Sequence, residues 1–314
     1  MAANSDLYLT TKELADLLRV KERKVYELAA ASEVPFTRVT GKLLFPRHLI
    51  EAWLARHTEV SGDLTALPDP PPVAAGSQDP LLDWALRESR CGIATFFDGS
   101  LDGIERLAKR EALFCGMHIA EPAGGGSTDS GGTRQWNSTR VANRFPMMPV
   151  VLTEWAWRER GLIVAPDNPL GIETVADLNG RRFVPRQAEA GAQHLFRDLL
   201  NEADVPESAL TLEAAARTEH DVAITVLNGR GDAGLGIASV AREYRLGFVP
   251  LLRERFDILV WRRSWFEGPF QALVAFCQTD TFRDKAEELG GYDVSGFGTV
   301  HYNGPSRPSG AAVC

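Results

Sequence analysis

From Asp79 to about Asn303, short apolar runs of the kind that form strands alternate with segments of helical periodicity. The strand-like runs include GIATFF, PVVLTEW, GLIVA, RRFVP, DAGLGI, GFVPL and FDILVW. Helical patterns stand between them, for example at Leu101–Ala112 and Glu219–Leu227. Strands regularly connected by helices are typical of α/β proteins with parallel sheets. We therefore predict an α/β fold for this region, built either as one large sheet or as two lobes.

Residues 1–57 show a different pattern, which predicts a small separate domain. The stretch LTTKELADLL has a Thr pair placed to cap a first amphipathic helix, and KERKVYELAAA predicts a second helix. The stretch VPFTRVTGKLLF then alternates like two strands around Thr40-Gly41-Lys42, which predicts a hairpin. A third helix is expected to begin at Pro46.

The charge of this N-terminal stretch differs from that of the whole chain. The net charge of −8 argues against nucleic acid as a partner. Between Val20 and His57, however, seven basic residues stand against four acidic ones. Several of the basic residues fall at the start of the second helix, where they oppose the helix dipole at a small cost in stability. Contact with phosphate groups would explain their position.

LTTKELADLL, VKERKVYELAA, VPFTRVTGKLLFP and HLIEAWL, taken in this order, closely resemble the winged helix-turn-helix domain of the excisionase and MerR-like families. In those families the second helix enters the major groove and the wing contacts the adjacent backbone or minor groove. The resemblance places on DNA the residues Lys21, Arg23, Lys24 and Tyr26 of the second helix and Lys42 of the wing. A helical protein–protein module is the alternative interpretation.

Two stretches of low periodicity border the α/β region. Residues 58–78, which include LPDPPPVAAGSQ, are predicted to form an extended Pro-rich linker between domains 1–57 and 79–303. Residues 304–314 are predicted to be a disordered tail. No run approaches the roughly 18–20 apolar residues of a membrane span, and the N-terminus lacks a basic region followed by an apolar core. We therefore expect a cytoplasmic protein with no membrane partner.

Two predicted helix starts follow strand-like runs through loops of small residues, and Thr218 marks a third helix start. In Arg182–Phe196 a strand is followed by Arg186 and Gln187 and then by Ala190, Gly191 and Ala192 at the start of a helix. Ser100 is placed to cap a second such helix, and Thr218 a third, followed by Asp221. Free N–H groups at helix starts carry partial positive charge and form natural anion sites. The simpler alternative is that these residues serve only as caps and turns.

A Gly/Ser-rich loop, Gly124–Asn137, lies between the first two of these helix starts. Loops of this composition close over ligands or simply move. Trp136 and Asn137 at its end provide a flat aromatic surface and an amide.

SLDGIERL, RERGLIVAPDNPLGI, LNGRRFVPRQAEAGAQHLF, RTEHDVAITVLNGRGDAGLGI, RFDILV and GGYDVSGFG, in this order, resemble a periplasmic-binding-protein-like sensor domain fused to small helix-turn-helix domains, a relative of molybdate-binding proteins. The resemblance implies a type II fold, with lobe one formed from both ends of the domain, lobe two from about Gly161 to Leu252, and the ligand in the cleft. Carried over by position, the ligand-binding residues are Ser100, Trp136, Asn137, Arg186, Gln187, Gly191, Ala192, Thr218 and Asp221.

Motifs of common enzyme classes are missing from the sequence. It contains no GxSxG, GxxxxGK[ST] or HExxH. Gly234, Gly236 and Ser239 only partly match a dinucleotide-binding motif, because the third glycine is lacking. The six histidines never fall three or four positions apart, and the four cysteines have no CxxC spacing, so no metal site is expected. We therefore expect no enzyme activity and no cofactor.

Two functions remain open at the level of sequence. The first is a one-component transcription regulator that binds operator DNA as a homodimer and senses a small anion, with molybdate or tungstate preferred. The second is an enzyme or carrier of molybdenum-cofactor metabolism, whose helix-turn-helix would be an interaction module. A bare oxyanion needs hydroxyl and backbone N–H donors, whereas a pterin phosphate would use Arg186 and stack on Trp136.

Overall fold

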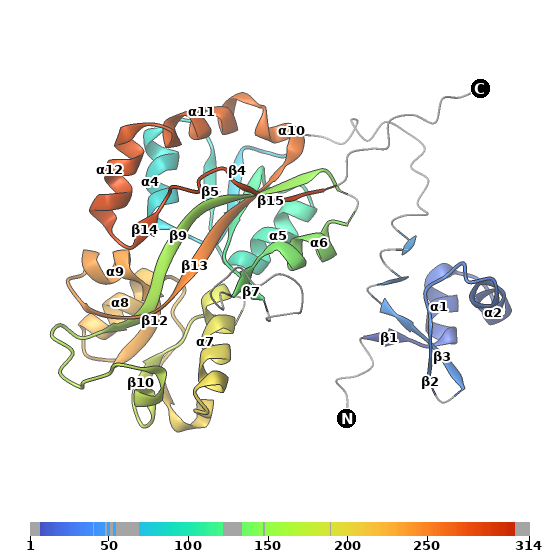
Figure 1. Cartoon of the computed structure of the whole chain (residues 1–314), viewed down its shortest axis with the longest axis horizontal. Helices are drawn as coiled ribbons and strands as arrows, with labels where there is room; N and C mark the ends of the chain where they lie inside the picture. The colour runs from blue at the N-terminus through green and yellow to red at the C-terminus, as the bar shows by residue number, and fades with distance from the viewer. Residues whose placement is uncertain are drawn as a thin grey trace. The chain divides into compact units, whose positions relative to one another are not determined.

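The computed structural model describes residues 7–39, 41–47, 49–50, 53–54, 69–121, 134–146, 148–188 and 190–304 (Figure 1). Contacts divide the chain into an N-terminal unit that ends at Pro68 and a larger unit that begins at Asp69, with Pro146–Met148 grouped with the former. Most of the predicted third helix, the Gly/Ser-rich loop up to residue 133, the first part of the predicted linker and nearly all of the predicted tail lie outside the described residues.

The described part of the N-terminal unit contains β1 (Tyr8–Leu9), α1 (Thr11–Leu18), α2 (Glu22–Ala30), β2 (Thr37–Val39) and β3 (Lys42–Pro46), with the strands in the order β1-β3-β2. Thr10 caps α1 in a capping box with Glu13, as the Thr pair in LTTKELADLL predicts. The predicted hairpin is also confirmed, because β2 and β3 pair antiparallel across the turn that contains Gly41. A small core with Leu14, Val25 and Phe45 at its centre holds these elements together.

The larger unit contains many more elements, which follow one another along the chain. They are β4 (Val73–Gly76), α4 (Pro80–Glu88), β5 (Ala94–Phe96), α5 (Ser100–Ala108), β6 (Phe114–Met117), β7 (Ala120–Glu121), β8 (Gln135–Trp136), α6 (Ser138–Arg144), β9 (Val150–Val164), η2 (Val175–Leu178), β10 (Arg182–Val184), α7 (Gly191–Glu202), η3 (Glu207–Ala209), β11 (Thr211–Leu212), α8 (Glu219–Leu227), β12 (Ala233–Ile237), α9 (Ala238–Glu243), β13 (Gly247–Trp261), α10 (Arg262–Trp265), α11 (Gly268–Cys277), α12 (Asp280–Leu289), β14 (Tyr292–Asp293) and β15 (Val300–Asn303).

One mixed sheet organises this unit. Its strand order is β11-β10-β12-β9-β13-β6-β4-β5, and β14 and β15 also pair with β9. The outer strands pair in parallel on both sides, β10 with β11 and β12, and β4 with β5 and β6. The prediction of parallel sheets is wrong at the centre, where β12, β9, β13 and β6 pair antiparallel.

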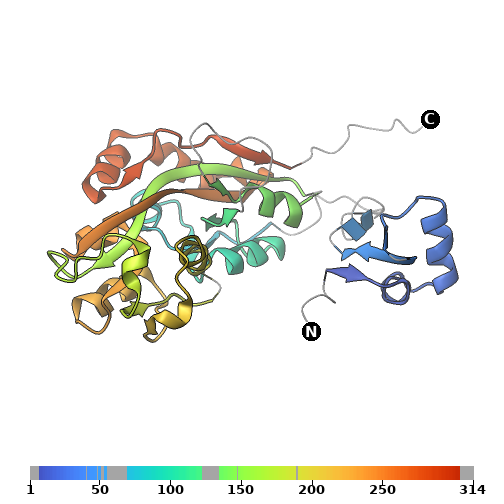
Figure 2. The ribbon, with the colours of Figure 1, turned by 60° about the horizontal axis from the view of Figure 1, so that its bottom comes forward.

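The two central strands, β9 and β13, run side by side through the whole unit (Figures 1 and 2). Each spans 15 residues. The sequence pattern predicts four separate strands here, because the charged triplets Arg158-Glu159-Arg160 and Arg253-Glu254-Arg255 interrupt the apolar runs. Several of these charged side chains are in fact buried in the strands, so the interruption does not mark a loop.

Two lobes form at the two ends of β9 and β13, as predicted. Lobe one packs α4, α11 and α12 on β4 and β6 around a core that includes Trp155 and Phe256. Lobe two packs α7, α8 and α9 on β10 and β12 in two adjoining clusters. Figure 1 shows α4, α11 and α12 in the upper part of the larger unit and α7, α8 and α9 in its lower part. The predicted linker reaches too far at its C-terminal end, because Val73–Gly76 forms β4 inside lobe one.

Gly161 of β9 pairs with Pro250 of β13, beside a bulge between Pro250 and Leu252. A Cβ at this position would lie 2.0 Å from the carbonyl oxygen of Val249. Gly161→Ala is therefore expected to lower the free energy of unfolding by about 1–3 kcal/mol, the usual cost of overpacking. Urea denaturation measures this loss. Gly268→Ala is the control, because nothing lies within 4 Å of the added methyl group, and an equal loss in both variants would contradict the prediction.

Candidate ligand-binding cleft

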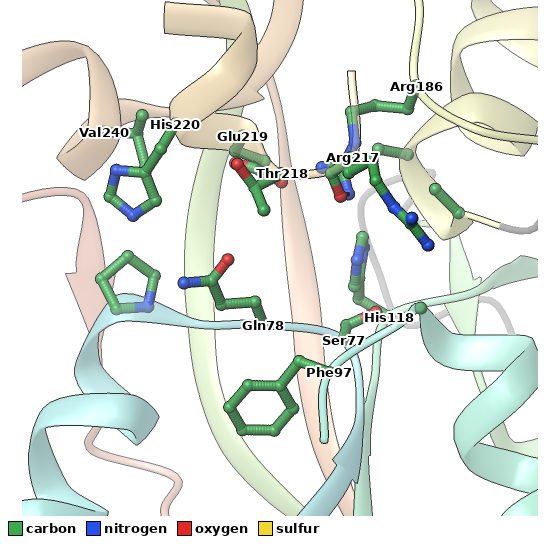
Figure 3. A pocket seen from close by; sticks show the side chains of 14 residues that line it. Ser77, Gln78, Phe97, His118, Arg186, Arg217, Thr218, Glu219, His220 and Val240 are labelled. Carbon is green, nitrogen blue, oxygen red and sulfur yellow. Dashed lines mark hydrogen bonds between the residues drawn. The ribbon is translucent and has the colours of Figure 1, made fainter. Parts of the chain in front are cut away.

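A small cavity lies between the two lobes and is lined from both sides (Figure 3). The lining residues are Ser77, Gln78, Pro80, Phe97, Gly99 and His118 of lobe one and Arg186, Ala190, Ala192, Arg217, Thr218, Glu219, His220 and Val240 of lobe two. The cavity volume is about 30 Å³. The lobes are therefore close together, and the space between them fits a small ion.

Two helix starts of lobe two border the cavity. Thr218 caps α8, and its hydroxyl oxygen accepts a hydrogen bond from the Asp221 N–H at 3.0 Å, so its hydrogen remains available as a donor. Ala190 and Ala192, at the start of α7, also line the cavity. Gly191 between them approaches lobe one closely, because a Cβ there would lie 3.0 Å from the His118 carbonyl oxygen.

Asp221 does not take the ligand-facing position that the resemblance implied. Its side chain is exposed, and its carboxylate accepts the Thr218 N–H at 2.9 Å to complete a capping box. This is the simpler of the two interpretations that the sequence left open.

Ser100 reaches the cavity through a second serine. The α5 helix is capped by Gly99 without a side-chain bond, so the prediction that Ser100 is the cap is wrong. The buried Ser100 Oγ lies 2.7 Å from Ser77 Oγ and accepts the His118 N–H at 3.3 Å. When Ser100 donates to Ser77, the Ser77 hydroxyl is free to donate into the cavity. Sequence reasoning missed Ser77 because this residue falls within the predicted linker.

Arg186 lines the cavity from lobe two, where the sequence placed it. Its Nε donates to the Ala216 carbonyl at 3.2 Å and its Nη2 to the Arg217 carbonyl at 2.7 Å. Burial lowers the pKa of Arg186, but the group stays charged because an arginine is effectively never deprotonated. Arg186 thus holds the loop before α8 in place while it faces the cavity.

Gln187 and Arg217 contact lobe one beside the cavity. The Gln187 amide lies between Asp98 on one side and the carbonyl oxygens of Ala216 and Arg217 on the other. Arg217 donates to the Asp98 carboxylate at 3.2 Å. Both contacts join the lobes in the closed arrangement.

Asn137 and Trp136 lie outside the cavity lining. The Asn137 amide oxygen accepts from the Ile119 N–H at 2.6 Å, and its nitrogen donates to Asp257 at 2.7 Å. Through these contacts Asn137 positions the main chain at Ile119, directly before β7. Trp136 is only 1% exposed and packs in the core of lobe two, so it offers no free aromatic surface to a ligand.

A group of paired charges adjoins the cavity through Glu219, and we call it the buried charge cluster: Asp79, Arg158, Arg160, Glu219 and Glu254. Arg158 contacts Asp79 at 2.8 Å and also Glu254. Arg160 contacts Glu254 and Glu219, both at 2.6 Å. Burial alone would raise the pKa of Glu254, but the two arginines hold it well below its usual value. Glu254 is therefore an ionised carboxylate.

The cluster reaches the cavity at two points. His118 Nδ1 lies 3.0 Å from Glu254 Oε2, and Glu219, which is 12% exposed, lines the cavity itself. Both residues were missed by the sequence analysis. The sequence pattern assigns Glu219 only to a helix end, and no motif singles out His118.

Comparison with known proteins identifies both units. A PBP superfamily domain matches residues 84–278, and a helix-turn-helix domain matches residues 8–58. The chain therefore belongs to the PBP (periplasmic-binding-protein) superfamily and carries an N-terminal DNA-binding domain. This combination is that of a DNA-binding regulator with a ligand-binding domain, and neither domain type is catalytic.

Two curated relatives match this chain over different lengths. The uncharacterized protein YvgK of Bacillus subtilis (strain 168) is 23% identical over 309 residues, which cover 93% of this chain and 96% of that protein. An uncharacterized protein in the 5′ region of a ferredoxin 2Fe-2S gene of Clostridium pasteurianum is 29% identical over 80 residues, covering 25% of this chain and 71% of that protein.

One solved structure supports the fold, and a second is reported as a similarity alone. A substrate-binding protein of Clostridium perfringens with bound phosphate has a TM-score of 0.50 and 10% identity, covering 69% of this chain and 96% of that chain. The regulatory domain of MetR, a LysR family regulator from N. meningitidis, has a TM-score of 0.48 and 14% identity, covering 70% and 96%. Within the part of the chain that the structure describes, no helix is long and apolar enough to cross a membrane.

Glu254→Gln tests the buried charge cluster. The change removes a negative charge that lies between two fully buried arginines. Breaking a buried pair in this way typically costs about 3–5 kcal/mol, because the remaining charge stays desolvated. Glu105→Gln is the control, since Glu105 pairs with Arg144 at the surface, where such pairs contribute about 0–1 kcal/mol. Similar unfolding free energies for the two variants in guanidinium titrations would rule out a structural role for the cluster.

Proposed function

We propose that this protein is a one-component transcription regulator whose cleft binds a small oxyanion, with molybdate or tungstate as the first candidate. The observation that supports this most is the size and lining of the cavity. About 30 Å³ between the lobes suits a few heavy atoms, and the Ser77 and Thr218 hydroxyls, the start of α7 and Arg186 supply donors around it. Donors that converge from several elements are what a compact anion requires.

The DNA-binding surface that we propose lies on α2 and on the β2–β3 hairpin. Lys21 is the N-cap of α2, and its exposed neighbours on the helix are Arg23, Lys24 and Tyr26. Lys42 is exposed at the start of β3. Arg23 and Lys24 lie 3.2 and 3.7 Å from Glu27 but remain more than half exposed, so both can exchange this contact for a phosphate.

Ligand and DNA binding are coupled, in this proposal, through lobe closure. A ligand that contacts Ser77 on one lobe and Thr218 on the other binds the closed state more tightly than an open one. The contacts of Asp98 with Gln187 and Arg217 stabilise the same closed state. A homodimer would then change how two helix-turn-helix units are presented to a two-fold operator.

The alternative, a protein that handles a pterin phosphate of molybdenum-cofactor metabolism, fits the structure less well. Trp136, the residue expected to stack on a pterin, is buried in lobe two.

Ligand binding is tested with the full chain and molybdate, tungstate, sulfate and phosphate by calorimetric titration. We expect Arg186→Ala to weaken binding of the tightest anion by about 1.5–3 kcal/mol, the contribution of a charge-assisted hydrogen bond. Ser77→Ala should cost about 1 kcal/mol, because it removes a neutral donor. Arg197→Ala is the matched control, since Arg197 lies on α7 but only contacts Glu207 at the surface. Normal binding by Arg186→Ala would place the ligand elsewhere.

DNA binding is tested with a Lys21→Ala/Lys24→Ala double variant of the full chain. Affinity for DNA should fall, and the slope of log K against log salt should decrease by about 0.9 for each phosphate that the protein no longer neutralises. Fluorescence anisotropy over a salt series measures both quantities. Lys12→Ala is the control, because Lys12 is an exposed lysine on α1. If the double variant keeps the slope of the unmodified protein, α2 does not contact the DNA backbone.

A further inference from the structure

His118 is the one histidine of the cavity that is tied to the buried charge cluster. It follows β6 and is 4% exposed. Its ring stacks on Phe256 at 5.9 Å between centroids, and its main-chain N–H donates to Ser100. Ring and backbone are therefore both held in place, and the ring extends from lobe one toward the side chains of Arg186 and Arg217 (Figure 3).

The contact with Glu254 determines which ring nitrogen carries hydrogen. An ionised carboxylate is only an acceptor, so the Nδ1 that lies 3.0 Å from Glu254 must be the N–H donor. In the neutral imidazole, Nε2 then bears a lone pair and acts as an acceptor. His118 lines the cavity, and its Cε1, which is bonded to both ring nitrogens, lies 3.4 Å from the position that a Cβ of Gly191 in lobe two would take. The cavity therefore presents a neutral acceptor, His118, next to its donors, in addition to the Glu219 carboxylate.

An acceptor in this position conflicts with a fully ionised oxyanion, whose oxygen atoms are all acceptors. We propose that His118 resolves this conflict by taking up one proton at Nε2 when the oxyanion binds, so that the imidazolium donates to a ligand oxygen. The inference rests on the proposed function, because it assumes that the cavity is the oxyanion site. It makes His118 a residue that determines which ionisation state of the ligand is bound.

The charges around His118 favour uptake of the proton when the oxyanion binds and not before. Burial lowers the pKa of His118, and Glu254 of β13 offsets part of this effect. Arg158 and Arg160 of β9 lower the pKa further, while Arg186 and Glu219 of lobe two face the same cavity with opposite charges. A bound anion adds negative charge to the cavity and raises the pKa of His118.

The affinity for a fully ionised oxyanion is expected to depend on pH. Between the low pKa of the free site and the raised pKa of the complex, binding consumes one proton, so affinity falls as pH rises. The expected change is about tenfold per pH unit in this window. An oxyanion that brings its own hydrogen, such as monohydrogen phosphate, donates it to Nε2 and binds without this dependence. His118 thus distinguishes fully ionised oxyanions, whose binding takes up a proton, from oxyanions that carry a hydrogen of their own.

The test is calorimetric titration of the full chain with molybdate between about pH 6.5 and pH 8, where this anion stays fully ionised. Repeating it in buffers of different ionisation heat counts the protons taken up. We expect uptake of about one proton and about a tenfold loss of affinity per pH unit. Binding without proton uptake would overturn this inference and leave the proposed function standing. Absence of binding at every pH would overturn both.

His118→Gln identifies the group that titrates. Glutamine retains a donor for Glu254 but cannot gain a proton, so the pH dependence should disappear. His194→Gln should keep it, because His194 is exposed on α7. His220 also lines the cavity, 3.7 Å from Glu243. Loss of the dependence in His220→Gln and its retention in His118→Gln would overturn the assignment, and proton counting on the unmodified protein does not require the variants to fold.

Discussion

The larger unit depends on the ion pairs that Glu254 forms with Arg158 and Arg160. These residues belong to β13 and β9, the strands that both lobes share, so the pairing fixes the strands to one another where the lobes meet. Charges buried this completely are tolerated only with close partners, since the desolvation penalty of each ion is several kcal/mol. Asp79 at the start of α4 and Glu219 at the start of α8 extend the cluster into each lobe.

The same charges explain where sequence-based prediction of the fold succeeded and failed. Helix caps, the hairpin and the alternation of strands and helices could be predicted, because they depend on local propensity and periodicity. The continuity of β9 and β13 could not, because a charged triplet in a strand normally indicates its end. Whether Arg158 is solvated or paired with Asp79 depends on a residue 79 positions away, which no local pattern encodes.

The candidate site divides in a similar way. Arg186, Ala192 and Thr218 were predicted because they stand at recognisable helix starts, and they line the cavity. Ser77 and His118 were missed, because each follows a strand that only the sheet topology brings to the cleft. Asn137 and Trp136 carry suitable chemical groups, but their partners within the fold use these groups. Spacing predicts which groups can bind, and tertiary contacts decide which of them remain available.

The charge balance of the cleft explains why a proton on His118 would strengthen the binding of an anion. The buried charge cluster contains two arginines and three carboxylates, and Arg186, whose charge lowers the pKa of Glu219, brings the total to zero. Arg217 is exposed and already contacts Asp98. A divalent oxyanion therefore meets partial charges of helix starts and hydroxyl dipoles, but little surplus full charge. One added proton on His118 supplies a full positive charge at the ligand. Because His118 bonds to Glu254 of β13, the same proton also changes the charge next to the strands that join the lobes.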